Sequence, residues 1–228
     1  MAQRKNSALI AELCAAAVLM VAVKFGVRIP AVAAAFRTDK ALMAHWQLWG
    51  AWAGWIIFSL YWEIAKSGST EVKRAESGLS RGIHVFLANI GLLLVVAPIL
   101  GLGRFMPIWP PVMAAGVVLE TAGLAFAIWA RLRLGRNWSG EITLKVDHQL
   151  IRTGPYRHLR HPIYTGLLAM FLGSILVTGE WLAVLGLALG VFAYIRKLRL
   201  EEVNMDSAFG AEYDAYRRES WAIVPFLY

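Results

Sequence analysis

A short segment in the last third of the chain combines residue types that can bind a charged small molecule. Residues 154–166 read Gly-Pro-Tyr-Arg-His-Leu-Arg-His-Pro-Ile-Tyr-Thr-Gly, and an apolar run follows directly. Gly154-Pro155 interrupts regular structure, because proline fixes φ and restricts the residue before it. Pro162 suits the first turn of a new helix. A polar, irregular segment beside a hydrophobic span is tolerated only where it lines an enclosed cavity or the interface. We therefore expect the chemistry of this protein at the segment 154–166.

The composition of the whole chain places that segment in a membrane protein. Mean hydropathy is +0.55, and only 17% of the residues are charged, whereas soluble domains carry about 25%. Most of the apolar segments reach the ~17–25 residues that cross a bilayer as a helix. We expect an all-α integral membrane protein with about six transmembrane helices. The apolar segments are 8–24, 44–65, 82–103, 111–130, 162–178 and 181–195.

The distribution of the basic residues predicts the orientation of these helices. The formal net charge is +8, and most lysines and arginines fall on one side if six spans begin with the N-terminus inside. That asymmetry follows the positive-inside rule. We therefore expect a protein of the cell (inner) membrane with both termini cytoplasmic. The basic excess is then a signal for topology and for anionic membrane lipids, and no nucleic-acid partner is expected.

The remaining polar and small residues of the spans favour packing roles. Cys14 is the single cysteine, so a disulfide framework is excluded. Glu120 lies inside an apolar segment, where an acid is a functional candidate, and a hydrogen bond between helices is an equally good explanation. Glycines four residues apart suit close helix packing. They are Gly50 with Gly54, and Gly186 with Gly190.

Several classes of chemistry lack support in the sequence. The segment around His148, His158 and His161 has no cysteine and no helical triad of metal ligands, so no metal is expected. A nucleophile elbow, a phosphate-binding glycine loop and a dinucleotide fingerprint are also missing. The short polar stretch 141–146 could form an extended pair.

A second group of polar residues lies beyond the last span. Lys197 and Glu201 stand four residues apart, on one face of a helix. The hairpin formed by the last two spans returns this face to the side of the segment 154–166. Glu202 points about 100° away from Glu201 and is expected to face elsewhere.

These residues resemble the isoprenylcysteine carboxyl methyltransferase family. The similarity covers about residues 131–225, in the family's order and spacing, and related enzymes that methylate phospholipid amines share part of it. Residues 1–130 add only apolar spans. The matching positions are His148-Gln149-Leu150-Ile151, Gly154-Pro155-Tyr156, Arg160-His161-Pro162-Ile163-Tyr164-Thr165-Gly166, Glu201-Glu202, Phe209-Gly210, Tyr213 and Tyr216.

The resemblance implies S-adenosylmethionine as methyl donor, bound in a cytoplasmic pocket formed by the last helical hairpin and flanking polar segments. It implies one domain over 1–228, with scaffold spans in 1–135 and the cofactor-binding and catalytic half in 136–228. Arg160 and Glu201 would be catalytic, and Glu201 would hold the ammonium group of the donor. The other implied donor-binding residues are His148, Gln149, Leu150, Ile151, Tyr156, His161, Pro162, Ile163 and Tyr164.

One departure from the family pattern concerns the methyl acceptor. The family has an arginine four residues before the glutamate, and this chain has Lys197, which lacks the bidentate fork of arginine. Lys197 is therefore the implied substrate-binding residue, for an isoprenylcysteine-like or lipidic carboxylate taken from the bilayer. Methylation of a phospholipid amine or of a small thiol is the alternative. A non-enzymatic membrane scaffold is the third hypothesis.

Overall fold

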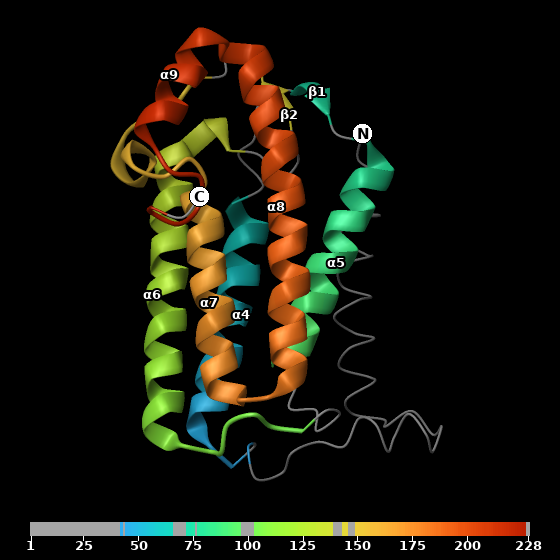
Figure 1. The fold of residues 1–228 in the computed structure, drawn as a ribbon, viewed down its shortest axis with the longest axis vertical. Coiled ribbons are helices and arrows are strands. Elements are labelled where there is room, and N and C mark those ends of the chain that lie inside the picture. Colours follow the sequence, from blue (N-terminus) through green and yellow to red (C-terminus); the bar gives the residue numbers. More distant parts are fainter. Residues whose placement is uncertain are drawn as a thin grey trace.

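A computed structural model describes residues 42, 44–65, 72–75, 77–96, 103–138, 143–145 and 149–226. This part of the chain folds into six α-helices, two short 3-10 helices and a two-stranded sheet (Figure 1). The expected first span 8–24, Cys14 and His148 lie outside the described residues. In chain order the elements are α4 (Trp46–Ala65), β1 (Val72–Ala75), α5 (Gly78–Val96), α6 (Pro110–Leu134), η2 (Gly135–Asn137), β2 (Thr143–Lys145), η3 (Gly154–Arg157), α7 (Pro162–Thr178), α8 (Trp181–Phe209) and α9 (Ala211–Glu219).

The helices run alternately up and down in one bundle (Figure 1). α4, α6 and α8 finish at one end of this bundle, and α5 and α7 begin there. The sheet, η3 and α9 lie at the same end, which we call the polar end. Three of the described helices, α5, α6 and α8, are long and apolar enough to cross a membrane, and α7 is a shorter apolar helix. The expectation of an all-α integral membrane protein is confirmed in its helical architecture, and the two-stranded sheet is an addition to it among the described residues.

Proline and glycine set the bounds of these helices. Pro162 occupies the first turn of α7, and Gly179 ends it in the left-handed conformation with φ 63°, which glycine adopts without steric cost. The amide of Gly179 donates to the carbonyl of Ile175 at 2.7 Å. Gly210 ends α8 with a positive φ of 48°, and α9 follows directly. The expected span 162–178 and the short hairpin after it therefore match the observed structure.

Facing glycines bring α7 against α6. A Cβ atom on Gly173 would lie 2.5 Å from the carbonyl oxygen of Gly116, and one on Gly166 would lie 2.6 Å from that of Gly123. Real Cβ atoms do not approach backbone so closely, so only glycine permits this packing. The same device joins α5 to α8, where a Cβ on Gly186 would lie 2.5 Å from the carbonyl oxygen of Gly91.

Gly173→Ala is expected to lower stability by about 1–3 kcal/mol, the usual cost of overpacking. The new methyl group would meet backbone atoms of Gly116 and Glu120, which cannot yield as a flexible side chain can. Gly82→Ala is the matched control, because a Cβ there has no neighbour within 4 Å. Thermal midpoints in detergent measure both variants. Equal midpoints would contradict the close-packing explanation.

Glu120 is buried in a hydrogen-bonded contact of three helices. Its Oε2 atom accepts a 2.7 Å hydrogen bond from the Ser174 hydroxyl, which in turn accepts one of 2.9 Å from the Trp55 indole N–H. The contact joins α6, α7 and α4. The structure therefore shows the hydrogen bond between helices that was one of the two explanations for Glu120.

A small antiparallel sheet joins two polar stretches of the sequence. The stretch 66–81 includes β1 and the start of α5. β2 falls inside the polar stretch 141–146, but it pairs with β1, Val72 opposite Lys145 and Ala75 opposite Thr143. Pairing between segments so far apart in the chain leaves no local signal in the sequence.

Candidate functional site

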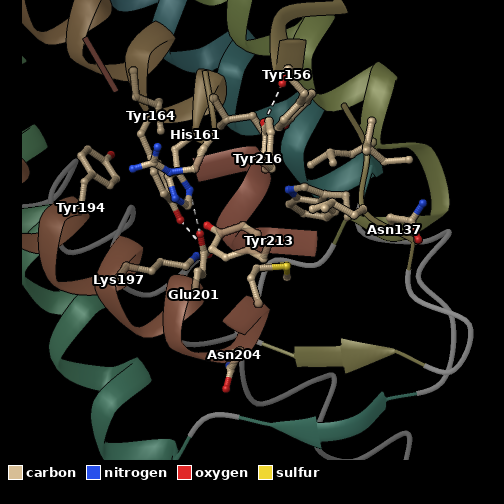
Figure 2. Close-up of a pocket in the computed structure, with 18 of the residues that line it drawn as sticks. Asn137, Tyr156, His161, Tyr164, Tyr194, Lys197, Glu201, Asn204, Tyr213 and Tyr216 are labelled. Atoms are coloured by element: carbon tan, nitrogen blue, oxygen red, sulfur yellow. Dashed lines mark hydrogen bonds and ion pairs between the residues drawn. The ribbon is translucent and has the colours of Figure 1, made fainter. Parts of the chain in front are cut away.

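A cavity of about 340 Å³ opens at the polar end of the bundle. Figure 2 shows its polar side chains converging from the segment 154–166, from α8 and from α9. Ligand pockets commonly have volumes of ~300–1,000 Å³, so the cavity is large enough for a small molecule.

The segment 154–166 is held in place by the C-terminal tail. The amides of Arg160 and His161 donate to the carbonyls of Trp221 and Ala222, at 2.8 and 2.9 Å. The hydroxyl of Tyr216, on α9, donates to the carbonyl of Tyr156 at 2.6 Å. These bonds satisfy backbone groups of η3 and of the short irregular stretch between η3 and α7. They also bring the tail beside the cavity, which Tyr213 and Tyr216 line.

Glu201 is the carboxylate of the cavity. At about 1.5 Å per residue, the 29 residues of α8 exceed the thickness of a bilayer core, so the helix carries Glu201 to the polar end. Its Oε1 atom accepts a 2.8 Å hydrogen bond from the Tyr164 hydroxyl on α7. Its Oε2 atom lies 3.5 Å from Nδ1 of His161. Figure 2 shows Lys197 beside it on the same helix.

His161 lies between two carboxylates. Nδ1 faces Glu201, and Nε2 lies 3.4 Å from Oε1 of Glu202. Both ring nitrogens therefore meet an acceptor, which suits the doubly protonated imidazolium. Burial lowers the pKa of His161, but the hydrogen bonds and charges of Glu201 and Glu202 outweigh burial, and the pKa is raised overall. The two carboxylates thus favour the protonated form of His161 at this side of the cavity.

Arg160 lines the cavity, yet most of its donors are engaged elsewhere. Its Nε atom donates to Oε1 of Glu202 at 2.7 Å, and Nη1 donates to the carbonyls of Arg217 and Ser220. Arg160 therefore joins α7's N-terminal segment to α8 and to the tail. The catalytic role that the resemblance implies for Arg160 stays a prediction beside this anchoring role.

Glu202 was expected to face elsewhere than Glu201. It is absent from the lining of the cavity, as the 100° offset from Glu201 requires. It is bound to Arg160, and its carboxylate lies 3.4 Å from Nε2 of His161. The pairing could not be read from the sequence, because Arg160 and Glu202 are brought together only by the α7–α8 hairpin.

Most of the expected site residues meet in this cavity. His148 lies outside the described residues, and Pro162 is buried at the start of α7 without lining the cavity. The functional role of each residue stays a prediction. The expected residues that line the cavity are Gln149, Leu150, Ile151, Tyr156, Arg160, His161, Ile163, Tyr164, Lys197 and Glu201.

Other lining residues were not expected, and several come from the part of the chain considered a scaffold. α4 and α5 supply an apolar and aromatic wall and one histidine. The sequence of an apolar helix does not indicate which neighbouring helix each face contacts, so these lining residues could not be predicted. Helical spacing from Glu201 would have indicated Tyr194, seven residues earlier on the same face. The unexpected lining residues are Phe58, Trp62, His84, Ala88, Leu134, Asn137, Trp138, Leu167, Tyr194, Asn204, Met205, Tyr213 and Tyr216.

Comparison with known proteins points to one class of enzymes. The model of the phospholipid methyltransferase family matches residues 111–212, a range that includes η3, α7, α8 and nearly all of α6. This range holds Arg160, His161, Tyr164, Lys197 and Glu201. The resemblance seen in the sequence is confirmed over this part of the chain.

Individual proteins with similar sequences are named as isoprenylcysteine methyltransferases. The chain is 28% identical over 101 residues to the protein-S-isoprenylcysteine O-methyltransferase of Schizosaccharomyces pombe, covering 43% of each chain. It is 28% identical over 115 residues to a probable protein-S-isoprenylcysteine O-methyltransferase of Oryza sativa subsp. indica, covering 49% of this chain and 60% of that one. The chain thus spans about half the length of these relatives.

One solved structure shows a low degree of similarity to this chain. It is described as the eukaryotic intramembrane Ras methyltransferase isoprenylcysteine carboxyl methyltransferase. The TM-score is 0.45 and the identity 19%, over 68% of this chain and 55% of that one.

Proposed function

We propose that this chain is an S-adenosylmethionine-dependent membrane methyltransferase that methylates the carboxyl oxygen of an isoprenylcysteine-like or lipidic carboxylate. The observation that carries this proposal is the position of Glu201, a carboxylate held by Tyr164 and His161 inside an aromatic cavity. The names of the relatives support the same activity.

The chemistry of the cavity fits the donor. Glu201 would hold the ammonium group, because a carboxylate forms its strongest hydrogen bonds with a charged donor. The rings of Tyr156, Tyr164 and Tyr194 line the cavity, and aromatic faces attract cations such as a sulfonium. The imidazolium of His161 would pair with the carboxylate of the donor. When bound, S-adenosylmethionine supplies a methyl group activated by its positively charged sulfur.

The residues of the chain would act by positioning and electrostatics. A carboxylate acceptor is already ionised at neutral pH, so it needs no general base. Lys197 would pair with that carboxylate and orient it toward the donor. The apolar side chains of Phe58, Trp62 and Leu167 line the same cavity and would exclude water from the reacting groups.

The proposed function also sets the orientation in the membrane. A donor from the cytoplasm requires the polar end of the bundle to face the cytoplasm, as the basic residues predict. The C-terminal tail would then be cytoplasmic, in the cell (inner) membrane, and the basic residues of the sequence predict the same side for the N-terminus. The apolar acceptor would come from the bilayer, between the spans.

Two measurements in detergent test the proposal. Calorimetry with S-adenosylmethionine is expected to show saturable binding, and its absence would leave the non-enzymatic scaffold as the better hypothesis. Transfer of a labelled methyl group is then expected to a farnesyl thioether carboxylate. The description of the matching family favours a second candidate acceptor, a phospholipid amine. Transfer to phosphatidylethanolamine or to a small thiol, with none to the carboxylate, would replace the proposed acceptor.

A further inference from the structure

A row of four aromatic rings crosses the cavity from α5 to the segment 154–166. The rings of His84 and Tyr194 have centroids 5.9 Å apart, those of Tyr194 and Tyr164 5.3 Å, and those of Tyr164 and His161 5.7 Å. We call these residues the aromatic row. All four line the cavity. His161 forms one end of the row and lies beside Glu201. His84 forms the other end.

The two ends of the aromatic row differ in charge and in hydrogen bonding. At one end, Glu201 lies 3.5 Å from Nδ1 of His161 and accepts a hydrogen bond from the Tyr164 hydroxyl. At the other end, Nδ1 of His84 lies 3.2 Å from the carbonyl oxygen of Ala193. A carbonyl can only accept, so Nδ1 carries the proton and donates it. In the neutral ring Nε2 is then a hydrogen-bond acceptor, and it has no partner among the described residues.

Lys197 lies on the same face of α8 as Tyr194 and Glu201. The spacing is three residues from Tyr194 to Lys197 and four from Lys197 to Glu201, which places the three along one stripe of the helix. All three line the cavity. Lys197 therefore separates the end with Glu201, proposed for the donor, from the end with Tyr194 and His84. The acceptor half of the cavity offers a cation at Lys197 and a hydrogen-bond acceptor at His84.

We propose that His84 is a specificity-determining residue, whose Nε2 accepts a hydrogen bond from an amide N–H next to the carboxylate of the methyl acceptor. This proposal rests on the proposed carboxyl methylation. A carboxylate has no hydrogen to offer Nε2, so the hydrogen must come from a neighbouring group of the same molecule. Lys197 disfavours an ammonium in that place, because like charges repel in a cavity of low dielectric. A neutral acylamino group on the carbon next to the carboxylate meets both conditions.

Paired acceptor analogues test this assignment. The S-farnesyl thioethers of N-acetylcysteine and of 3-mercaptopropionate share the chain and the carboxylate, and only the first carries the amide. The full-length wild-type protein is expected to prefer the amide analogue about tenfold in kcat/KM, the effect of one buried hydrogen-bond acceptor.

Two substitutions at His84 separate Nε2 from the rest of the ring. His84→Asn keeps a donor near the position of Nδ1, where it can still reach Ala193, and removes Nε2. It is expected to abolish the preference by lowering kcat/KM for the amide analogue alone. His84→Gln places an amide oxygen near the position of Nε2 and is expected to restore part of the preference. Calorimetry with S-adenosylmethionine is expected to give the same donor affinity for all three proteins.

The outcomes distinguish this inference from the proposed function. Equal loss with both analogues, or no loss in His84→Asn, would overturn the role of His84. If the wild type transfers no methyl group to either analogue, the proposed acceptor class fails. Equilibrium binding of the two analogues to the wild type and to His84→Asn then decides the role of His84 by itself. If the wild type binds the amide analogue about tenfold more tightly and His84→Asn does not, the role of His84 is supported. If the wild type binds the two analogues with equal affinity, that role is overturned.

Discussion

Replacing Glu201 with glutamine is expected to weaken the binding of S-adenosylmethionine about ten- to a hundredfold. The substitution keeps the size of the side chain and an oxygen that can accept from Tyr164, and it removes the negative charge. Hydrogen bonds to charged groups contribute roughly 1.5–3 kcal/mol, which corresponds to that range of affinity. Calorimetry in detergent measures the loss.

The fold is expected to survive this change. His161 keeps Glu202 as a charged neighbour at 3.4 Å when Glu201 is neutralised. Glu212→Gln is the control, because Glu212 is exposed on α9 and does not line the cavity. The variant at 212 is expected to bind the donor as the wild type does. An unchanged affinity in Glu201→Gln would remove Glu201 from the donor site.

Lys197→Ala provides the complementary result. Lys197 lines the cavity and is proposed to pair with the carboxylate of the acceptor, so its loss is expected to impair use of that acceptor and to leave donor affinity nearly unchanged. Glu201→Gln and Lys197→Ala, on one face of α8, are thus expected to affect donor binding and acceptor use separately. A loss of donor affinity in Lys197→Ala would show that the face of α8 serves the donor alone.

Local signals in the sequence were sufficient for the helices that carry the site. Pro162 and Gly179 mark the ends of α7 because their backbone preferences are intrinsic to those residues. The four-residue spacing of Lys197 and Glu201 is likewise a property of any helix. The hairpin then requires α7 and α8 to meet, which brings Glu201 to the level of His161 and Tyr164. These parts of the cavity could therefore be predicted.

Contacts between distant segments could not be predicted in the same way. Phe58 and His84 belong to apolar helices whose pattern shows no preferred face. Their place in the cavity depends on the packing of α4 on α6 and of α5 on α8, and the glycines that fix this packing are compatible with several partners. Glu202 is a similar case, because its angle from Glu201 follows from helix geometry, whereas its pairing with Arg160 follows from the tertiary fold.

The pair of Arg160 and Glu202 leads to the largest expected effect on stability. Arg160→Gln removes the 2.7 Å contact with Glu202 and the bonds from Nη1 to the carbonyls of Arg217 and Ser220. The side chains are only 10% and 17% exposed. Leaving one charge of a buried pair without its partner costs about 3–5 kcal/mol. We expect a strong fall in the thermal midpoint and faster proteolysis of the tail after α8.

A double substitution distinguishes the stability lost with the ion pair from the cost of leaving the Glu202 carboxylate unpaired. Arg160→Gln with Glu202→Gln is expected to be more stable than Arg160→Gln alone, because no isolated carboxylate remains. Arg152→Gln is the control, since its ion pair with Glu219 is exposed and such pairs contribute about 0–1 kcal/mol. If Arg160→Gln is no less stable than Arg152→Gln, the pair does not hold the tail. Loss of methyl transfer at unchanged stability would instead favour the catalytic role of Arg160, because an anchor cannot fail without loosening the tail that it holds.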